Sequence, residues 1–464
     1  MTSAELPLAS IPHGFKAELA AMARLALPIV VVQLSQMMLG VVDTLMIGRV
    51  SAEALAAIAL ANLYVFGGLI FGMGALMGLD PVVAQAAGAG DTVAVSRGVQ
   101  RGLMLAVGLS VVASVLLLPA RPVMLWLRQP PVVADMAATY VQLFIIGVLP
   151  FFGFTALRQS LQALKLLAPI VWASLIANLA NVGLNYVLIF GKLGFPAMGV
   201  AGAAWATGIC RWFMLGLLAA LAWRHMRPHL RPWRLEGIEW APLGRMLAIG
   251  APIGFQMQLE YGVFAVVGVM MGWLGTVELA AHQVALNLAS LTFMVPMGVS
   301  AAAAVLVGHA VGRGDPPEAR RAAAAALCCG VGFMAVSGAL MLTAPGFLAR
   351  VYTSQAPVAA LAAALIPIAG VFQVFDGTQV VSIGILRGVA DTRTPMLVNI
   401  LGYWVIALPL SAALGFTAGL GPRGLWWGLT VGLVLVALVL VVRVRRHLAG
   451  EITRVVIDQE VATV

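Results

Sequence analysis

The chain has 464 residues, of which 62% are hydrophobic and only 10% are charged. Soluble domains are about 45–50% apolar and about 25% charged, so a soluble fold is excluded and lipid must cover part of the surface. The formal net charge of +9 does not indicate nucleic-acid binding, because the basic residues lie in short segments between apolar runs, where they act as topology signals.

Twelve apolar segments follow one another along the chain, and each is long enough to cross a bilayer as a helix of about 20 residues. They lack the alternating pattern of about ten residues that marks the strands of a membrane β-barrel. The predicted fold class is therefore an all-α polytopic membrane protein, with kinks at Pro28, Pro252 and Pro296. The predicted spans are 24–48, 54–79, 98–119, 137–160, 167–190, 199–223, 245–273, 279–308, 321–345, 358–385, 394–419 and 424–442.

Lys and Arg residues gather on one side of these spans. Twelve spans place both termini on the same side, and about 20 of the 27 basic residues lie at the termini and in the even-numbered loops. Cytoplasmic loops are enriched in Lys and Arg, so both termini are expected in the cytoplasm. The longest polar connection, 224–244, is interpreted as a cytoplasmic linker between an N-lobe, 1–223, and a C-lobe, 245–464.

The two halves of the chain match each other when one is shifted by 224 residues. The shift covers six spans, an even number, so the halves cross the membrane in the same direction. Parallel repeats of this kind occur in transporters, whose two lobes expose a central site to each side of the membrane in turn. The repeat therefore indicates a transporter. The matched residues include Pro28 with Pro252, Met73-Gly74 with Met297-Gly298, Gly88 with Gly312, Gly90 with Gly314 and Asp91 with Asp315.

Three carboxylates lie inside the spans: Asp43 in the first, Glu260 in the seventh and Asp376 in the tenth. An ionisable group near the bilayer centre costs at least about 2.5–3.5 kcal/mol and is a functional candidate by default. Such a group can take up and release a proton, or two of them can hold Na⁺ with neighbouring carbonyl groups. Either role couples an ion gradient to export, whereas the alternative is a hydrogen-bonded carboxyl with a structural role only. Asp80, near the cytoplasmic end of the second span, is a weaker candidate.

Amide and imidazole side chains accompany these carboxylates. Asn181 and Asn185 are four residues apart and so share one helix face. The alternative role for such amides is hydrogen bonding between helices. The 22 methionines and the aromatic residues could line an adaptable pocket, because Met repacks easily, although ordinary core or lipid contact is the favoured interpretation for most of them. The candidate residues of a polar cavity are Gln33, Gln36, Asn178, Gln256, His282 and Gln283.

The sequence contains no P-loop, HExxH or GxSxG motif. We therefore expect no enzymatic activity and no cofactor beyond a coupling ion. Cys210, Cys328 and Cys329 lie in apolar stretches without disulfide or metal spacing, so they are interpreted as core residues.

Several segments together resemble the multidrug and toxic compound extrusion (MATE) family, close to its bacterial NorM-type members. The resemblance covers essentially the whole chain in the family's order, and the combination is specific although each piece alone is weak. The segments are PIVVVQLSQMMLGVVDTLMIGRV, NVGLNYVLIFGKLGFPAMGVAGAAWAT, APIGFQMQLE, ELAAHQVALN and VFDGTQVVSIGILRGVADTRTP.

The resemblance implies a V-shaped pair of six-helix lobes in the bacterial inner membrane. Such a protein exports cationic amphiphilic compounds in exchange for H⁺ or Na⁺ by alternating access. The resemblance further implies that the N-lobe couples to protons at Asp43, with Asn181 and Asn185 beside it.

For the C-lobe the resemblance implies a site for a proton or Na⁺ at Glu260 and Asp376. Some Na⁺-coupled members place a Tyr one turn before this Asp, where the present chain has Phe372. The departure removes one oxygen ligand and favours H⁺ as the coupling ion.

Two other functions are considered. A lipid-linked oligosaccharide flippase of the same superfamily needs a basic cavity for pyrophosphate, and Arg211 is the only basic residue that we expect in mid-span. An ion channel, from a different class, has less need of two matched lobes. The expected partners are small organic cations and the lipid bilayer, with no nucleic acid, and we expect the protein to act as a monomer.

Overall fold

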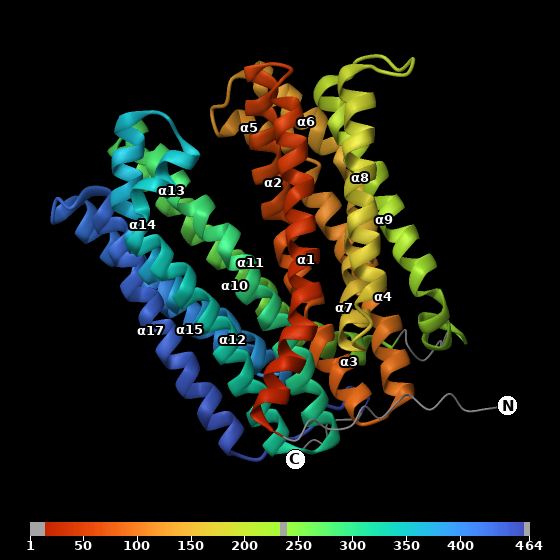
Figure 1. Ribbon diagram of the computed structural model, residues 1–464. Helices are drawn as coiled ribbons and strands as arrows, with labels where there is room; N and C mark the ends of the chain where they lie inside the picture. The colour runs from red at the N-terminus through yellow and green to blue at the C-terminus, as the bar shows by residue number, and fades with distance from the viewer. Residues whose placement is uncertain (1–13, 233–238, 459–464) are drawn as a thin grey trace.

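The computed structural model describes residues 14–232 and 239–458, and within them it is built of helices joined by short loops (Figure 1). Twelve helices of these parts are long and apolar enough to cross a membrane, which confirms the predicted number of spans. In the N half the helices are α1 (Phe15–Ile47), α2 (Ala52–Leu76), α3 (Leu79–Gly88), α4 (Thr92–Leu117), α5 (Ala120–Trp126), α6 (Pro131–Phe144), η1 (Ile145–Gly147), α7 (Val148–Ala163), α8 (Ala168–Phe190) and α9 (Gly199–Leu230).

The C half repeats this order after the loop that follows α9. Its short helix α13 lies at the position that corresponds to α5 in the N half. In the C half the helices are α10 (Trp240–Leu274), α11 (Thr276–Arg313), α12 (Pro316–Thr343), α13 (Pro345–Tyr352), α14 (Ala356–Gly388), α15 (Arg393–Asn399), η3 (Ile400–Ala407), α16 (Leu408–Ala412), η4 (Ala413–Thr417) and α17 (Gly421–Ala449).

Several helices extend beyond the predicted spans, because backbone hydrogen bonding continues past the last apolar residue of a run. The first helix begins at Phe15, and α9 continues to Leu230 while α10 begins at Trp240. Much of the predicted linker 224–244 is therefore helical, and residues 233–238 of it lie outside the described residues.

The repeated Gly-Asp pair forms the same local structure in both halves. Gly90 and Gly314 each have a φ of +70°, a left-handed conformation that glycine adopts without steric cost. The next residue then caps the following helix, since Asp91 Oδ1 accepts from the backbone N–H of Ala94 at 2.9 Å, and Asp315 makes the same bond three residues on. The Gly-Asp pair that recurs in the sequence thus forms, in each half, a tight turn between two helices with the Asp as the N-cap of the second helix.

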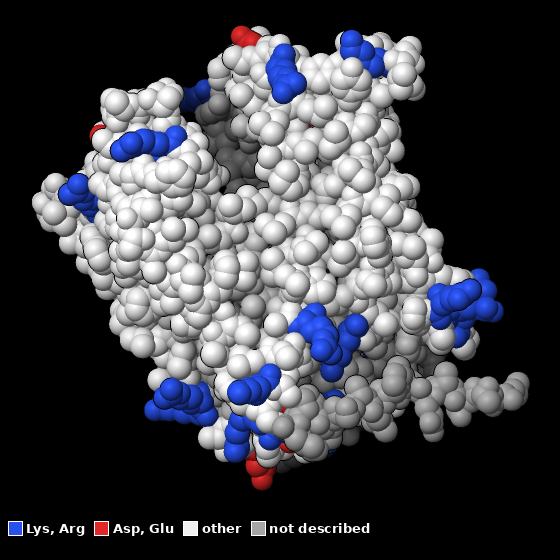
Figure 2. Space-filling view, viewed as in Figure 1, with Lys and Arg blue, Asp and Glu red and all other residues white. Residues whose placement is uncertain are grey.

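The helices form two bundles that lean apart at one end of the molecule (Figure 1). Helix α1 begins and α17 ends at the other end, which we call the closed end. Figure 2 shows the surface hollowed between the two bundles near the end opposite to the closed end. One large cluster of buried apolar residues fills the N half and continues into the C half, and a second cluster lies within the C half.

Glycines bring the two halves into backbone contact near the closed end. A Cβ atom on Gly88 of α3 would overlap the carbonyl oxygen of His309 on α11. A Cβ atom on Gly312 of α11 would overlap the carbonyl oxygen of Gln85 on α3. The two contacts are related by the shift of 224 residues, so the repeat forms a pseudo-symmetric seam. A second contact pair with the same relation joins Gly74 to Gly254 and Gly298 to Val30.

We expect Gly312→Ala to destabilise the protein by about 1–3 kcal/mol, the usual cost of overpacking a tight contact. The added methyl group would meet a backbone carbonyl, which cannot move aside as a flexible side chain can. Thermal unfolding of the purified protein measures the effect. Gly332→Ala on α12 is the matched control, because a Cβ atom there meets nothing within 4 Å. Equal unfolding temperatures for the two variants would contradict a tight seam at Gly312.

Candidate functional site

A cavity of about 440 Å³ lies between the two halves of the chain. Helices α1, α2 and α7 line it from the N half, and α10, α11, α14 and α17 line it from the C half. Transporters built from two lobes bind their substrates between the lobes, so this is the expected location of a substrate site. Flexible thioether side chains and rings make up much of its apolar lining, from Met73, Met77, Met257, Met297, Phe66, Tyr261, Phe264, Phe293, Phe372 and Trp426.

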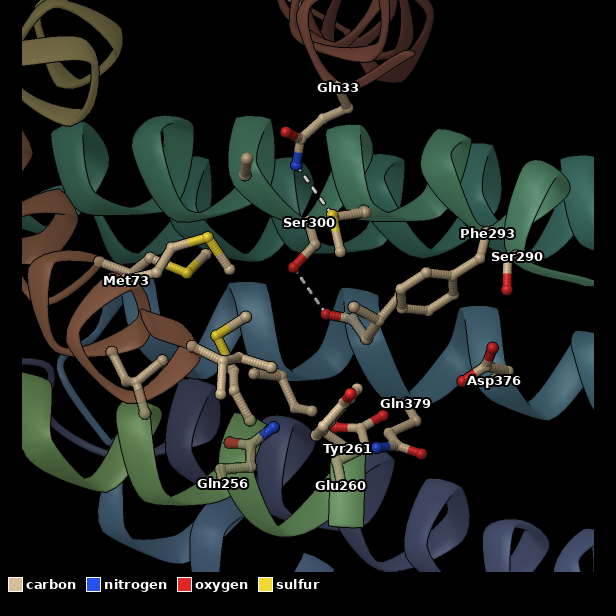
Figure 3. A pocket seen from close by; sticks show the side chains of 18 of the residues that line it. Gln33, Met73, Gln256, Glu260, Tyr261, Ser290, Phe293, Ser300, Asp376 and Gln379 are labelled. Carbon is tan, nitrogen blue, oxygen red and sulfur yellow. Dashed lines mark hydrogen bonds between the residues drawn. The ribbon is translucent and has the colours of Figure 1, made fainter. Parts of the chain in front are cut away.

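Both carboxylates predicted for the C half line this cavity: Glu260 on α10 and Asp376 on α14 (Figure 3). The two groups are close enough to interact electrostatically. Gln256 lies one helical turn before Glu260 on α10 and also lines the cavity. The structure therefore brings the predicted pair together, on two helices that are far apart in the sequence.

The residue one turn before Asp376 is Phe372, which lines the cavity with its ring. This ring packs edge-on against Phe264, with centroids 6.2 Å apart, and against Trp426 at 5.8 Å. The position thus belongs to an aromatic cluster and supplies no oxygen to the carboxylate pair.

An oxygen-bearing side chain near the pair was missed by the sequence analysis. Tyr403 of η3 is buried within electrostatic range of Glu260 and Asp376. Its hydroxyl donates to Oε1 of Gln379, a cavity residue, at 2.8 Å. Carboxylate and carbonyl oxygens are the ligands that hard cations prefer. The sequence signal was a phenol in a mainly apolar span, one helical turn after Asn399.

Within the described ranges, no group of three His, Cys, Asp or Glu side chains could hold a metal ion. A cation at Glu260 and Asp376 would therefore need neutral oxygens to complete its ligands, such as those of Tyr403 and Gln379.

The residues predicted for the N half form a second, separate cluster. Asp43 on α1 is 3% exposed and accepts a hydrogen bond at 2.5 Å from Asn185 Nδ2 on α8. The same amide nitrogen donates to Oδ1 of Asn181 at 3.1 Å. Thr207 on α9, which the sequence analysis missed, donates its hydroxyl to Asp43 at 2.8 Å. These residues lie apart from the lining of the central cavity.

Arg211 also lies inside the N half. Its guanidinium group sits over the ring of Phe144 at 4.1 Å and near the ring of Phe151 at 4.8 Å. Because it is not a cavity residue, it cannot serve as the basic group of a substrate site there.

Of the six candidate cavity residues, Gln33 and Gln256 line the cavity and the other four do not. The amide of Asn178 donates to the backbone carbonyl of Ser35 at 2.8 Å, which turns it into the N half. The ring of His282 is buried beside Trp426. Gln283, the next residue on α11, points about 100° away from His282 and is exposed on the surface. The residues placed outside the cavity are thus Gln36, Asn178, His282 and Gln283.

A polar network closes the cavity towards the closed end. Arg387 on α14 forms an ion pair with Asp80 on α3 at 3.2 Å, and both side chains are almost completely buried. Gln159 donates to the same carboxylate at 3.4 Å. Arg158 on α7 donates to Gln33 Oε1 at 3.2 Å. The network joins the two halves across the seam.

This network corrects two interpretations of the sequence. Asp80 is fully buried at the inter-lobe contact, because α3 begins after a break at Met77–Gly78 and turns the carboxylate inward. Arg158 and Arg387 are buried cavity residues rather than topology signals, so Arg211 is not the only basic group within the spans.

Comparisons with known proteins agree with this architecture. The MatE family model matches residues 28–187 and 252–413, and the two matches begin at repeat-related positions. The chain is 37% identical to "Probable multidrug resistance protein NorM" of Rhizobium meliloti (strain 1021), over 94% of this chain and 95% of the relative. It is 38% identical to "Multidrug resistance protein NorM" of Burkholderia vietnamiensis, over 90% and 92%.

A crystal structure of the eukaryotic MATE transporter AtDTX14 has the same fold, with a TM-score of 0.86 and 23% identity over 93% of this chain and 96% of that one. The chain covers 95% and 92% of the lengths of the two NorM relatives, and the two family-model matches together span more than half of this chain. The protein is therefore a multi-pass membrane transporter rather than an enzyme, and it belongs to the MATE family.

Proposed function

We propose that this protein exports cationic amphiphilic compounds from a bacterial cell in exchange for H⁺ or Na⁺. The observation that carries the proposal is the placement of Glu260 and Asp376 in a cavity between two repeat-related lobes, whose apolar lining is rich in Met and aromatic residues. The carboxylates attract a cation, while the thioether and ring surfaces adapt to apolar groups of different shapes. The relatives named for multidrug resistance support the same function.

The positive-inside rule supports a cytoplasmic location for the closed end, since α1 begins and α17 ends there. With that orientation in the inner membrane, the hollow in Figure 2 opens outward. The seam at Gly88 and Gly312 and the ion pair between Asp80 and Arg387 hold the cytoplasmic ends together in this state. Export then requires these contacts to break so that the lobes open inward and load substrate.

The two acidic sites suggest two points of coupling to the ion gradient. Occupancy of Asp43, or of Glu260 with Asp376, by a proton or Na⁺ would favour one lobe arrangement over the other. Phe372 favours H⁺ because it adds no ligand, whereas Tyr403 and Gln379 are the neutral oxygens that a Na⁺ site would use.

Transport of a fluorescent organic cation into or out of proteoliposomes tests the proposal, with a pH gradient and a Na⁺ gradient imposed separately. We expect transport with one or both gradients. A response to Na⁺ that Tyr403→Phe removes would assign the ion to the C-lobe site, and a response to protons alone would agree with Phe372. Folded protein that transports under neither gradient would contradict the proposal.

The flippase alternative requires a cavity that binds pyrophosphate. Arg158 and Arg387 do line the cavity, but Arg387 is already paired with Asp80. Among the described residues, the cavity lining then holds one unpaired guanidinium group, that of Arg158, against two carboxylates, Glu260 and Asp376, so the balance of charge favours cations over a multiply charged anion.

A further inference from the structure

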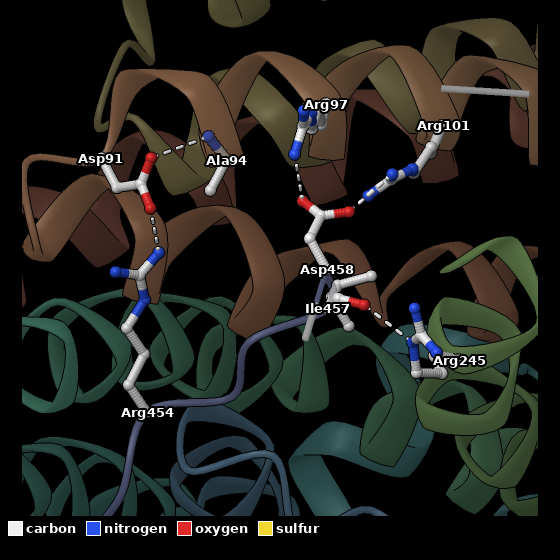
Figure 4. Close-up of polar contacts among 8 residues, drawn as sticks. All are labelled: Asp91, Ala94, Arg97, Arg101, Arg245, Arg454, Ile457 and Asp458. Carbon is white, nitrogen blue, oxygen red and sulfur yellow. Dashed lines mark hydrogen bonds and ion pairs between the residues drawn. The ribbon is translucent and has the colours of Figure 1, made fainter. Parts of the chain in front are cut away.

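The chain does not end where its last membrane helix ends. After α17, residues 450–458 run in an extended conformation to the N half (Figure 4). Arg454 forms an ion pair with Asp91 at the start of α4, at 2.8 Å. Asp458 forms ion pairs with Arg101 at 2.6 Å and with Arg97 at 3.2 Å, both on α4. The segment therefore connects α17 of the C half to α4 of the N half.

The same segment is also attached to the seam between the halves. The backbone N–H of Val455 donates to Oε1 of Gln85 at 2.8 Å, and the Nε2 of Gln85 donates to the carbonyl of Gly388 at 2.9 Å. Arg245, near the start of α10, donates to the carbonyl of Ile457 at 2.7 Å. One buried glutamine thus hydrogen-bonds both the extended segment and α14.

The docked segment is partly buried rather than loosely apposed. Ile457 joins the large apolar cluster that fills the N half. The segment forms one wall of a groove of about 160 Å³, and Val82 and Ala86 of α3 lie on its other side. Hydrogen bonds from the backbone of Ala94 and from Arg454 hold the pKa of Asp91 below its usual range.

Burial alone would raise the pKa of Asp458, but hydrogen bonds and ion pairs with Arg101 and Arg97 bring it below the usual value. Both carboxylates therefore stay ionised at neutral pH and keep their ion pairs.

We propose that residues 450–458 form an inter-lobe strap, which holds the closed end together in this state and must release before the lobes can part there. Only residues 450–453 separate the end of α17 at Ala449 from the contact at Arg454. Because an extended residue spans at most about 3.3–3.6 Å, these four residues are a short tether. If α17 and α4 move apart by more than residues 450–453 can extend, the contacts of the strap with α4 must break. The inference rests on the alternating access of the proposed function.

Cysteine accessibility tests the strap without any measurement of transport. Ala86→Cys, in a protein whose three native cysteines are replaced by Ser, reports exposure of the groove to a maleimide in nanodiscs. Both faces are accessible there, so the result does not depend on orientation or on the identity of the substrate. Val82→Cys is a second reporter in the same groove.

We expect slow labelling of the reporter with an intact strap. Asp458→Asn and Arg454→Gln should each raise the labelling rate about fivefold, as expected for loss of partly exposed ion pairs. Glu451→Gln is the matched control, since it removes an exposed carboxylate from the same segment. Labelling that is equally slow in all three variants, or already fast in the parent, would overturn the strap.

A second experiment asks whether the strap must release. Arg97→Cys with Asp458→Cys, joined by a short cleavable dithiol linker, should stop cation transport until the linker is cut. Transport by the unlinked double variant gives the baseline and separates a failed strap from a failed exporter. Linked protein that transports at the baseline rate would show that the strap stays docked throughout the cycle.

Discussion

Export driven by an ion gradient is expected to fall about 5–150-fold in Glu260→Gln and in Asp376→Asn, the range that a coupling free energy of 1–3 kcal/mol gives. Each replacement keeps the shape of the side chain and its capacity to accept a hydrogen bond. Neither amide can carry a negative charge or take up a proton, so the cavity loses a group that distinguishes the ion-bound from the ion-free state. Both side chains line the cavity, where an amide is readily accommodated, and we therefore expect normal insertion and folding.

The measurement is gradient-driven movement of a fluorescent cation by each variant in proteoliposomes. Glu53→Gln is the matched control, because it removes an exposed carboxylate at the start of α2. Asp43→Asn tests the N half in parallel, where the carboxylate accepts hydrogen bonds from Asn185 and Thr207. Parent-like export in both C-half variants would remove Glu260 and Asp376 from the coupling mechanism.

The sequence revealed the spans and the isolated charges because both are local signals. An apolar run of about 20 residues predicts a membrane helix whatever it packs against. A carboxylate inside such a run, as at Asp43, Glu260 or Asp376, is conspicuous for the same reason. The spacing of Asn181 and Asn185 placed both on one helix face, and the structure has their side chains hydrogen-bonded to each other.

Interactions between distant segments were not predictable in this way. Asp80 and Arg387 lie near the ends of their spans, where charged residues are common, so nothing local marked them as a buried pair. Tyr403 carried no charge, and its proximity to Glu260 depends on how η3 packs against α10. The contacts of Arg454 and Asp458 depend on where the chain goes after its last helix. In each case the missing information is the packing of the two halves.

The buried ion pair between Asp80 and Arg387 is expected to contribute the largest single effect on stability. Asp80→Ala should destabilise the protein by about 3–5 kcal/mol, because it leaves a guanidinium group buried without its counter-charge. The pair is 3.2 Å apart, with side-chain exposures of 0% and 4%. An exposed pair offers the matched control: Arg121 and Asp135 are 2.6 Å apart but 56% and 53% exposed. Arg121→Ala should cost about 0–1 kcal/mol, as solvent-exposed ion pairs do.

Thermal and denaturant unfolding of the purified variants measure these differences. The double variant Asp80→Leu with Arg387→Met should recover most of the lost stability, since replacing a whole buried pair by apolar residues is often neutral or favourable. It should nevertheless weaken the attachment between α3 and α14, because the charge attraction that joins the halves is gone. We therefore expect this variant to be stable and yet to label faster at Ala86→Cys than the parent.

If Asp80→Ala were no more destabilised than Arg121→Ala, the pair would not be buried in the prevailing state. The closed end would then depend on the glycine seam and the strap alone.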